Sequence, residues 1–255
     1  MLLAIDAGNT NIVFGLYDGE TWRHVWRLET HPLRPFADYG MFLRMHLLEA
    51  GLRLDDVQRT VLSSVVPAAV EPLQQAIKAL LKREALWLRA EVYPQLPVRT
   101  ERPYEIGSDL VANALAAYER FHEYCMVVDF GTALTFTIVS DRGDILGVTI
   151  APGLKTAIRA LAGNTAQLPE VPLELPHSAI GRSTVHAIQA GILYGYTGMV
   201  EGMIRRINTE LDQKCRVMAT GGLSSILTTL HDQFDEVDPN LTLDGLRWVD
   251  YYAHR

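Results

Sequence analysis

The sequence predicts an α/β fold of two similar halves, each a mixed β-sheet with flanking helices. Residues 4–10 and 127–133 share one pattern, an apolar strand followed by Asp, any residue, Gly and small polar residues. The two copies lie 123 residues apart, nearly half of the 255-residue chain, and such a recurrence is typical of a duplicated unit. Strand-like and helix-like segments alternate through much of the remaining chain, which favours the α/β class.

Each half opens with a predicted β-meander. In the first half the strands cover residues 2–6, 11–17 and 22–28, and the Asp18-Gly19 pair is a hairpin signal. In the second half the strands cover residues 125–130 and 134–140, and a turn at residues 141–143 leads into a third strand. Asp18 lies 12 residues after Asp6, as Asp141 does after Asp129. The repeat therefore extends beyond its first motif.

Helices and two further strands complete the prediction. The expected helices cover residues 37–50, 67–83, 108–118, 154–162, 184–211 and 224–230. Strands are expected at residues 60–66 and 216–220, and a proline-rich loop at residues 167–176. We place the domain boundary near residues 115–124, with a first domain of residues 1–118 and a second of residues 119–255.

The composition excludes several classes of partner. With 30 acidic and 23 basic residues the net charge is −7, which argues against a general nucleic-acid binder. No apolar run approaches the roughly 20 residues that cross a bilayer, and Asp6 interrupts the apolar start before a signal-peptide core could form. Cys125 and Cys215 give no disulfide or zinc pattern, so we interpret both as buried residues of a cytoplasmic protein.

Three loops that follow strands are candidates for phosphate binding: the Asp6 loop, the Asp129 loop and the Gly221-Gly222 turn. In open α/β folds, ligands bind at the carboxyl ends of strands, and glycine lets backbone N–H groups approach a phosphate. Asn9 and Thr10 add donors, whereas Asp6 would act through a divalent cation. The alternative is an ordinary hairpin with local side-chain bonds. The second copy at Asp129 favours a phosphate clamp, and the chain carries neither a P-loop nor a dinucleotide fingerprint.

Five motifs together resemble a known family. They are Asp6-x-Gly-Asn-Thr-Asn, Gly107-Ser-Asp, Asp129-Phe-Gly-Thr-Ala, Gly181-x-x-Thr and Thr220-Gly-Gly. Their order and separations over residues 1–251 resemble the type III pantothenate kinases, of the acetate/sugar kinase–Hsp70–actin superfamily. The resemblance implies two ribonuclease-H-like, actin-like ATPase domains. It also implies a cytoplasmic homodimer, with the substrate site at the subunit interface, that phosphorylates pantothenate with ATP in the first step towards coenzyme A.

The resemblance also assigns residues. It implies ATP binding by Asp6, Ala7, Gly8, Asn9, Thr10, Asn11, Ile12, Val13 and Thr132, and an adenosine-side turn at Gly221 and Gly222. It implies pantothenate binding by Gly107, Ser108, Asp109, Leu110 and Thr184, with Asp109 as the general base. Mg²⁺ would accompany ATP, and Asp129 would bind a monovalent cation, potassium or ammonium.

The residues themselves support a base at Asp109 and leave other interpretations open. A carboxylate at the start of a helix is well placed to take a hydroxyl proton, but it could also simply complement the helix dipole. Thr184 could cap the long helix that follows it.

Two positions depart from the family. Leu110 stands where an arginine is common and Thr100 where a tyrosine is common, so Arg102 or another residue would have to compensate. A kinase for another small hydroxy acid and a non-catalytic, nucleotide-binding transcriptional regulator are therefore the rival hypotheses.

Overall fold

Two compact units make up the chain. The structure, a computed structural model, describes residues 1–222, 224 and 228–255. Residues 1–116 and 241–255 form unit 1, and residues 117–240 form unit 2. The last 15 residues, expected in the second domain, thus belong to the first, because their helix packs on strands of unit 1.

Unit 1 is built on a mixed five-stranded sheet of order β3-β2-β1-β4-β5. The meander β1–β2–β3 is antiparallel, and β4 and β5 add to it in parallel on the other side of β1. The bounds are Leu2–Ala7 for β1, Asn11–Tyr17 for β2, Trp22–Glu29 for β3, Arg59–Ser64 for β4 and Leu86–Trp87 for β5. This arrangement places the end of β4 beside the end of β1.

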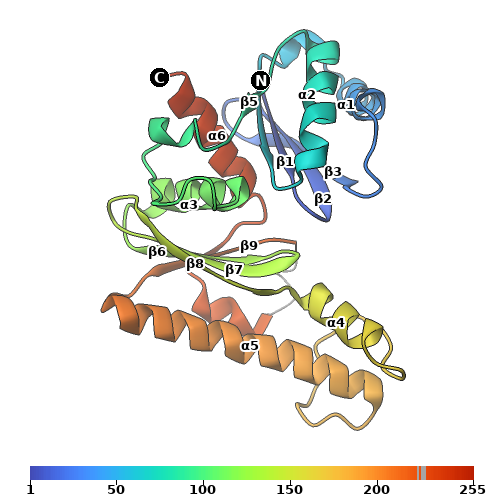
Figure 1. Cartoon of the computed structure of the whole chain (residues 1–255), viewed down its shortest axis with the longest axis vertical. Helices are drawn as coiled ribbons and strands as arrows, with labels where there is room; N and C mark the ends of the chain where they lie inside the picture. The colour runs from blue at the N-terminus through green and yellow to red at the C-terminus, as the bar shows by residue number, and fades with distance from the viewer. Residues whose placement is uncertain (223, 225–227) are drawn as a thin grey trace. The chain divides into compact units, whose positions relative to one another are not determined.

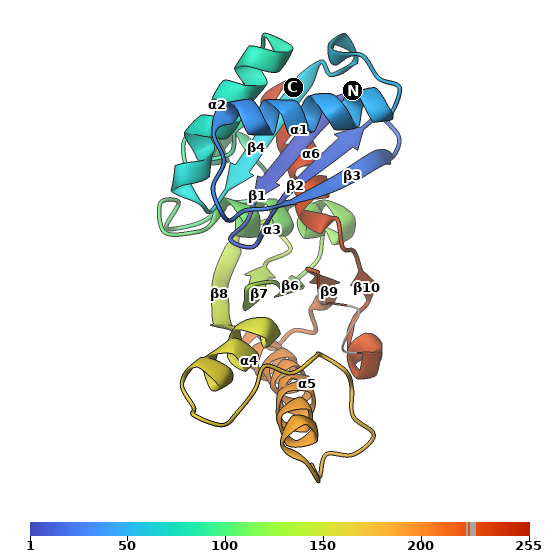
Figure 2. The ribbon, with the colours of Figure 1, turned by 90° about the vertical axis from the view of Figure 1, so that its right-hand side faces the viewer.

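Helices cover both faces of this sheet. They are α1 (Phe36–Glu49), α2 (Pro67–Leu81), α3 (Ser108–Phe121) and α6 (Leu241–Ala253), with 3-10 turns η1 (Leu54–Asp56) and η2 (Tyr93–Gln95). α1 and α2 lie on one face of the sheet and α6 on the other (Figures 1 and 2). Tyr39 and Leu43 of α1 are fully buried in one core with Phe14 of β2. The two-residue alternation of β2 buries Ile12, Phe14 and Leu16, as expected for a strand with one face on the core.

The C-terminal helix α6, which the sequence did not predict, is an integral part of unit 1. It buries Leu243 and Leu246. A Cβ at Gly245 would lie 2.0 Å from the Ala112 carbonyl oxygen, so only glycine allows α3 and α6 to approach this closely. Trp22 Nε1 donates a hydrogen bond of 2.8 Å to Asp244 Oδ1. These contacts tie the end of the chain to its beginning.

Unit 2 repeats the strand plan of unit 1. Its sheet has the order β10-β9-β6-β7-β8, with an antiparallel meander β6–β7–β8 and parallel β9 and β10 beside β6. The strands are β6 (Cys125–Phe130), β7 (Ala133–Val139), β8 (Ile145–Pro152), β9 (Arg216–Thr220) and β10 (Glu236–Val237). The equivalent order and directions confirm the duplication that the sequence predicts.

The helices of unit 2 are α4 (Leu154–Gly163), α5 (Thr184–Leu211) and the 3-10 turn η3 (Thr228–Gln233). α5 packs along the sheet with Leu193, Val200 and Ile204 in the core (Figure 1). Of the helix expected at residues 224–230, residues 225–227 lie outside the described residues, and residues 228–230 belong to the 3-10 turn η3. Both cysteines are buried, as predicted, and burial raises the pKa of Cys125 to about 12. Among the described residues, no helix has the length and apolarity needed to span a bilayer.

Candidate active site

The first predicted phosphate loop joins β1 to β2 and is fixed by backbone bonds. Gly8 N donates to the Asn11 carbonyl oxygen at 3.0 Å, and Thr30 Oγ1 donates to the Gly8 carbonyl oxygen at 2.7 Å. Asn9 and Thr10 are exposed, whereas Ala7 and Ile12 are buried. Ala7 and Ile12 therefore belong to the core and could reach a nucleotide only through their backbone, while Asn9 and Thr10 lie at the surface.

A serine pair at the end of β4 connects this loop to the start of α3. The parallel register places Ser63 beside Asp6 and Ser64 beside Ala7. The Oγ atoms of Ser63 and Ser108 lie 2.9 Å apart, within hydrogen-bond distance, and Ser64 N donates to Ser108 Oγ at 3.2 Å. The first residue of α3 is thereby bound to the strand next to β1. The structure thus brings residues 107–110 to the sheet edge that carries the Asp6 loop.

Asp109, the predicted base, lies in the first turn of α3. Its Oδ1 accepts a 2.8 Å hydrogen bond from Leu110 N. Its surface is partly exposed, but the surrounding protein desolvates the carboxylate and raises its pKa, an effect that the bonds from N–H groups oppose. A Cβ at Gly107 would lie 2.4 Å from Asp109 Oδ1, so glycine leaves the room that the carboxylate occupies. A raised pKa is typical of a carboxylate that exchanges protons.

Tyr93 of η2 is a neighbour of Asp109 that sequence reasoning missed. Burial raises the pKa of Tyr93 to about 12, and the charge of Asp109 contributes to this shift. The phenol therefore keeps its proton near the carboxylate at neutral pH. Nothing in the local sequence around Tyr93 signals this, because the loop that carries it meets α3 only in the fold. The Ser63-Ser64 pair, in contrast, had a signal, since two adjacent hydroxyls interrupt the apolar residues of the predicted strand 60–66.

The two positions that depart from the family have ordinary structural roles. Leu110 is only 9% exposed and belongs to the buried face of α3. Thr100 Oγ1 accepts a 3.3 Å hydrogen bond from Arg102 N. Arg102, the expected replacement cation, is exposed and forms a 3.0 Å ion pair with Glu105. The described contacts therefore assign Arg102 to Glu105, and its expected role toward the substrate stays a prediction.

In unit 2 the ends of β6 and β9 bring Asp129 and the glycine turn together. Asp129 pairs with Thr220 in the parallel register. Gly221, at φ +92°, follows, and a Cβ there would lie 2.5 Å from Asp129 Oδ1 and 2.7 Å from the Phe130 backbone. A Cβ at Gly222 would meet nothing within 4 Å. Position 221 thus requires glycine for its φ and for its space, whereas position 222 faces an open region.

The second predicted phosphate loop packs against the start of α4. The Thr132 carbonyl oxygen accepts hydrogen bonds from Gly153 N at 3.0 Å and from Thr156 Oγ1 at 2.7 Å. The Thr132 side chain is exposed. The loop is therefore fixed by its backbone, and the Thr132 side chain lies at the surface.

Thr184 is the first residue of α5 and is exposed. Its neighbour Ser183 is the N-cap, since Ser183 Oγ accepts a 3.3 Å bond from His186 N. The capping role considered for Thr184 therefore falls to Ser183. Among the contacts of the described residues, none joins Thr184 to Asp129 or Thr132, so the structure does not gather it with the other predicted residues of unit 2.

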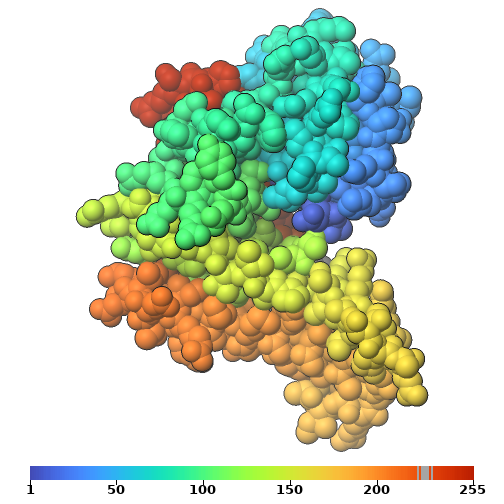
Figure 3. All heavy atoms as spheres, in the orientation of Figure 1, coloured from blue at the N-terminus to red at the C-terminus, as the bar shows by residue number. Residues whose placement is uncertain are grey.

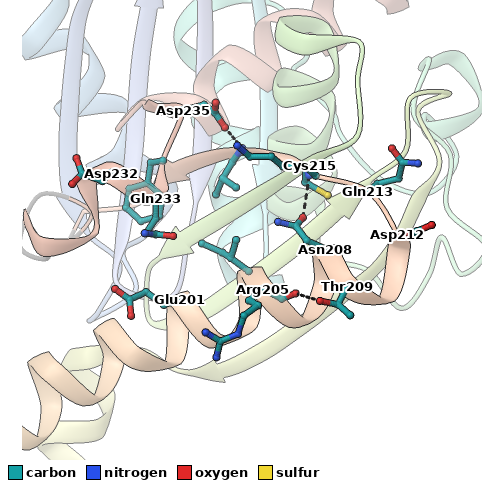
Figure 4. A pocket seen from close by; sticks show the side chains of 14 residues that line it. Glu201, Arg205, Asn208, Thr209, Asp212, Gln213, Cys215, Asp232, Gln233 and Asp235 are labelled. Carbon is teal, nitrogen blue, oxygen red and sulfur yellow. Dashed lines mark hydrogen bonds between the residues drawn. The ribbon is translucent and has the colours of Figure 1, made fainter.

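A hollow of about 930 Å³ in unit 2 lies away from these loops. It is lined by the C-terminal half of α5, the start of β9 and residues 232–235 (Figure 4). Several polar side chains in it are used structurally: Asn208 Oδ1 accepts from Cys215 N at 3.0 Å, and Asp235 Oδ2 accepts from Val217 N at 2.8 Å. Cys215 and Val217 are at the opposite end of β9 from Thr220, so this hollow is separate from the Asp129 turn.

Comparison with known proteins identifies the family. A model of the type III pantothenate kinase family matches residues 2–206. The chain belongs to this family. A type III pantothenate kinase of Anaeromyxobacter sp. (strain K) is 43% identical over 247 residues, 97% of each chain. One of Moorella thermoacetica is 43% identical over 249 residues, 98% of each chain. The chain is therefore a kinase of this family over essentially its whole length.

Solved structures of low sequence identity share the fold. A putative 2-dehydro-3-deoxygalactonokinase of Sinorhizobium meliloti has a TM-score of 0.60 at 12% identity and covers 100% of this chain and 96% of its own. MreB 5 of Spiroplasma citri, bound to AMPPNP, has a TM-score of 0.56 at 12% identity, with 99% and 96% covered. A putative Baf family transcriptional activator of Campylobacter jejuni has a TM-score of 0.57 at 20% identity, with 99% and 98% covered. These likenesses confirm the predicted fold of actin-like ATPases and sugar kinases, and they support the fold alone.

Proposed function

We propose that this chain transfers the γ-phosphoryl group of ATP to the primary hydroxyl of pantothenate, giving 4′-phosphopantothenate, the first step of coenzyme A biosynthesis. The observation that carries the proposal is the placement of Asp109. A carboxylate of raised pKa is fixed at the start of α3, beside the sheet edge that bears the Asp6 loop. Full-length relatives named type III pantothenate kinase support the choice of substrate.

In this proposal each part of unit 1 has one task. Phosphoryl transfer needs positioning, neutralisation of charge and a group that accepts the hydroxyl proton. The backbone of residues 6–13 and the side chains of Asn9 and Thr10 bind the phosphates. Asp109 accepts the proton from the pantothenate hydroxyl, and Asp6 helps to hold the Mg²⁺ that accompanies ATP. Charge neutralisation is what a bound Mg²⁺ would supply.

A monovalent cation, potassium or ammonium, is proposed at Asp129. Glycine at position 221 leaves space directly against the Asp129 carboxylate, which a Cβ would fill. The part of the chain that the structure describes has no group of three or more His, Cys, Asp or Glu side chains that could hold a metal ion. The other ligands of a cation at Asp129 would therefore be backbone carbonyls, water and nucleotide, a set of oxygen ligands that suits a weakly bound hard cation. Thr132 and the Gly221-Gly222 turn would contact the nucleotide.

We further propose a cytoplasmic homodimer that uses exposed apolar side chains of unit 2. Ile150, Ile180 and Val185 expose 67%, 76% and 42% of their surface. Val185 directly follows Thr184, the predicted substrate contact. Large apolar side chains that are this exposed favour an interface, and a subunit interface would place Thr184 where a partner's substrate could reach it.

A coupled assay of ADP release with and without pantothenate tests the proposed function. We expect ADP release that depends on pantothenate, with 4′-phosphopantothenate identified by mass spectrometry. Faster turnover with another small hydroxy acid would replace the substrate and keep the kinase. Nucleotide binding without turnover of any acid would contradict the proposal and favour the regulator.

A further inference from the structure

Helix α1 of unit 1 has apolar side chains on two faces, and the unit buries only one of them. Tyr39, Leu43 and Leu47 form the buried face. Met41, Met45 and Leu48 expose 62%, 54% and 74% of their surface. Their spacing of four and three residues places them on one face of the helix. We call Met41, Met45 and Leu48 the exposed face of α1, and α1 itself lies on the outer layer of the unit (Figures 2 and 3).

Two opposite charges border this exposed face. Asp38 and Arg44 are both exposed, and each lies three residues from Met41. Three residues turn a helix by about 300°, so the acid and the base lie on opposite flanks of Met41, one toward each end of the helix. Among the described residues neither forms an ion pair. The face is therefore an apolar strip with an acidic flank at one end and a basic flank at the other.

We propose that α1 packs against α1 of a second copy of this chain, with the helices crossing at Met41 on a two-fold axis. A two-fold interface uses the same patch on both partners, so the patch must be complementary to itself. When the helices cross, the axis places Asp38 of each copy opposite Arg44 of the other, and both ion pairs form at once. Met41 meets its equivalent, and methionine side chains adapt to such contacts.

This interface is independent of the homodimer proposed above, which uses unit 2. It rests on the charge pattern around Met41. A patch made for an acidic or a basic partner would carry one sign of charge, whereas Asp38 and Arg44 place both signs in positions symmetric about Met41. The interface therefore adds a second mode of self-association, and the mass of the particles in solution reports it.

A charge-swap experiment tests the proposal, with mass measured by light scattering and sedimentation over a range of protein concentrations. Asp38→Arg and Arg44→Asp each place like charges opposite one another, so each variant alone should weaken association at α1 by at least about tenfold. At concentrations where the wild type associates, its particles should weigh twice those of either variant. A 1:1 mixture of the two variants, and the double variant by itself, should recover the wild-type mass. Asp55→Arg, an exposed carboxylate outside α1, is the matched control and should behave as wild type.

Equal masses of the wild type and both single variants at every concentration would overturn the proposal, as would a mixture that fails to recover the mass. Binding of the exposed face to lipid vesicles or to a different protein, without self-association, would overturn it as well. Kinase activity per chain is measured in parallel and should not change in any of these variants. Failure of this interface is therefore distinguishable from failure of the proposed function.

Discussion

The Asp6 loop and the Asp129 loop occupy equivalent places in the two units but have different neighbours. Each follows the first strand of a meander, and each lies beside a parallel strand. In unit 1 that parallel strand ends in Ser63-Ser64, whose groups bond to Ser108. In unit 2 the parallel strand ends in Thr220, and Gly221 then turns tightly against Asp129.

This difference indicates how one scaffold supports two tasks. The duplicated sheet provides two similar edges, each with an aspartate. The residues at the end of the neighbouring parallel strand determine which groups lie beside that aspartate. In unit 1 the serine hydroxyls fix the start of α3, and α3 carries the second carboxylate, Asp109, which suits proton transfer. In unit 2 Gly221 leaves space beside Asp129, which suits a cation or a nucleotide. The following predictions test this division of tasks, beginning with the largest expected effect.

Asp109→Asn should separate catalysis from binding. The amide keeps the size and the hydrogen bond from Leu110 N but cannot accept the proton, so turnover should fall by roughly 10²–10⁴-fold. ATP affinity, measured by calorimetry, should change little, because Asp109 is not part of the predicted ATP loop. Near-normal turnover would remove Asp109 from the mechanism and with it the special role of unit 1.

Asp129→Ala should affect the dependence on monovalent cations. The wild type should require potassium or ammonium and fail with sodium or lithium alone. The variant should lose at least about tenfold in turnover and respond weakly to the choice of salt. Equal wild-type activity in every monovalent salt would contradict the cation site.

Gly221→Ala should damage unit 2 through both space and backbone conformation. A positive φ disfavours alanine by about 1–2 kcal/mol, and the Cβ would also collide with the Phe130 backbone and Asp129. We expect a lower free energy of unfolding and weaker ATP binding. Gly222→Ala is the matched control, since its Cβ would enter open space. Equal effects of the two substitutions would show that the Asp129 contact is unimportant.

Ser108→Ala should loosen the start of α3. Removal of the hydroxyl leaves the buried Ser63 hydroxyl without that partner, at a cost of about 1–3 kcal/mol in the free energy of unfolding. Turnover should fall more than ATP affinity, because the loss acts on the position of Asp109. Ser183→Ala, which removes the N-cap of α5, is the control. It should lower the free energy of unfolding by a similar amount, but turnover should not fall more than ATP affinity.

The raised pKa of Asp109 predicts a small gain in stability for Asp109→Asn. A carboxyl whose pKa is higher in the folded state binds protons more tightly there than in the unfolded chain. Its contribution to folding is therefore greatest at low pH and declines as pH rises from the ordinary value of 3.8 through the raised one. Where the carboxyl is ionised, the wild type carries a desolvated negative charge that the amide lacks, so thermal unfolding of the variant relative to the wild type should shift to higher temperature as pH rises. A shift to lower temperature as pH rises would contradict the dominant role of burial.

Local signals explain which elements could be predicted from the sequence. α5 begins at Thr184 and ends at Leu211, as predicted, because a cap residue precedes it and its apolar positions recur with helical spacing. The Asp-x-Gly repeat likewise predicted two related sheets. α6 was missed although Asn240 precedes an apolar run, because the strands that it covers lie more than 170 residues earlier in the sequence.

The site was predictable only where its chemistry is local. Gly107 and Asp109 are separated by one residue in the sequence, so the motif and the geometry coincide. The bond from Ser63 to Ser108 depends on the register of β4 beside β1 and on the path of the intervening chain. The proximity of Tyr93 to Asp109 depends on how one loop folds back on α3. Interactions of this kind are set by tertiary packing, which no local pattern contains.

The return of α6 to unit 1 has a consequence for synthesis on the ribosome. Unit 2 is continuous, so all of its residues have been made by residue 240, whereas unit 1 lacks a core helix until residues 241–253 have left the exit tunnel. Domains generally fold as units during translation, N-terminal ones first. Here that order is reversed, because the half that is made first is the last to be completed. A nascent chain from which residues 241–253 have not yet emerged would therefore carry unit 1 with one face of its sheet uncovered.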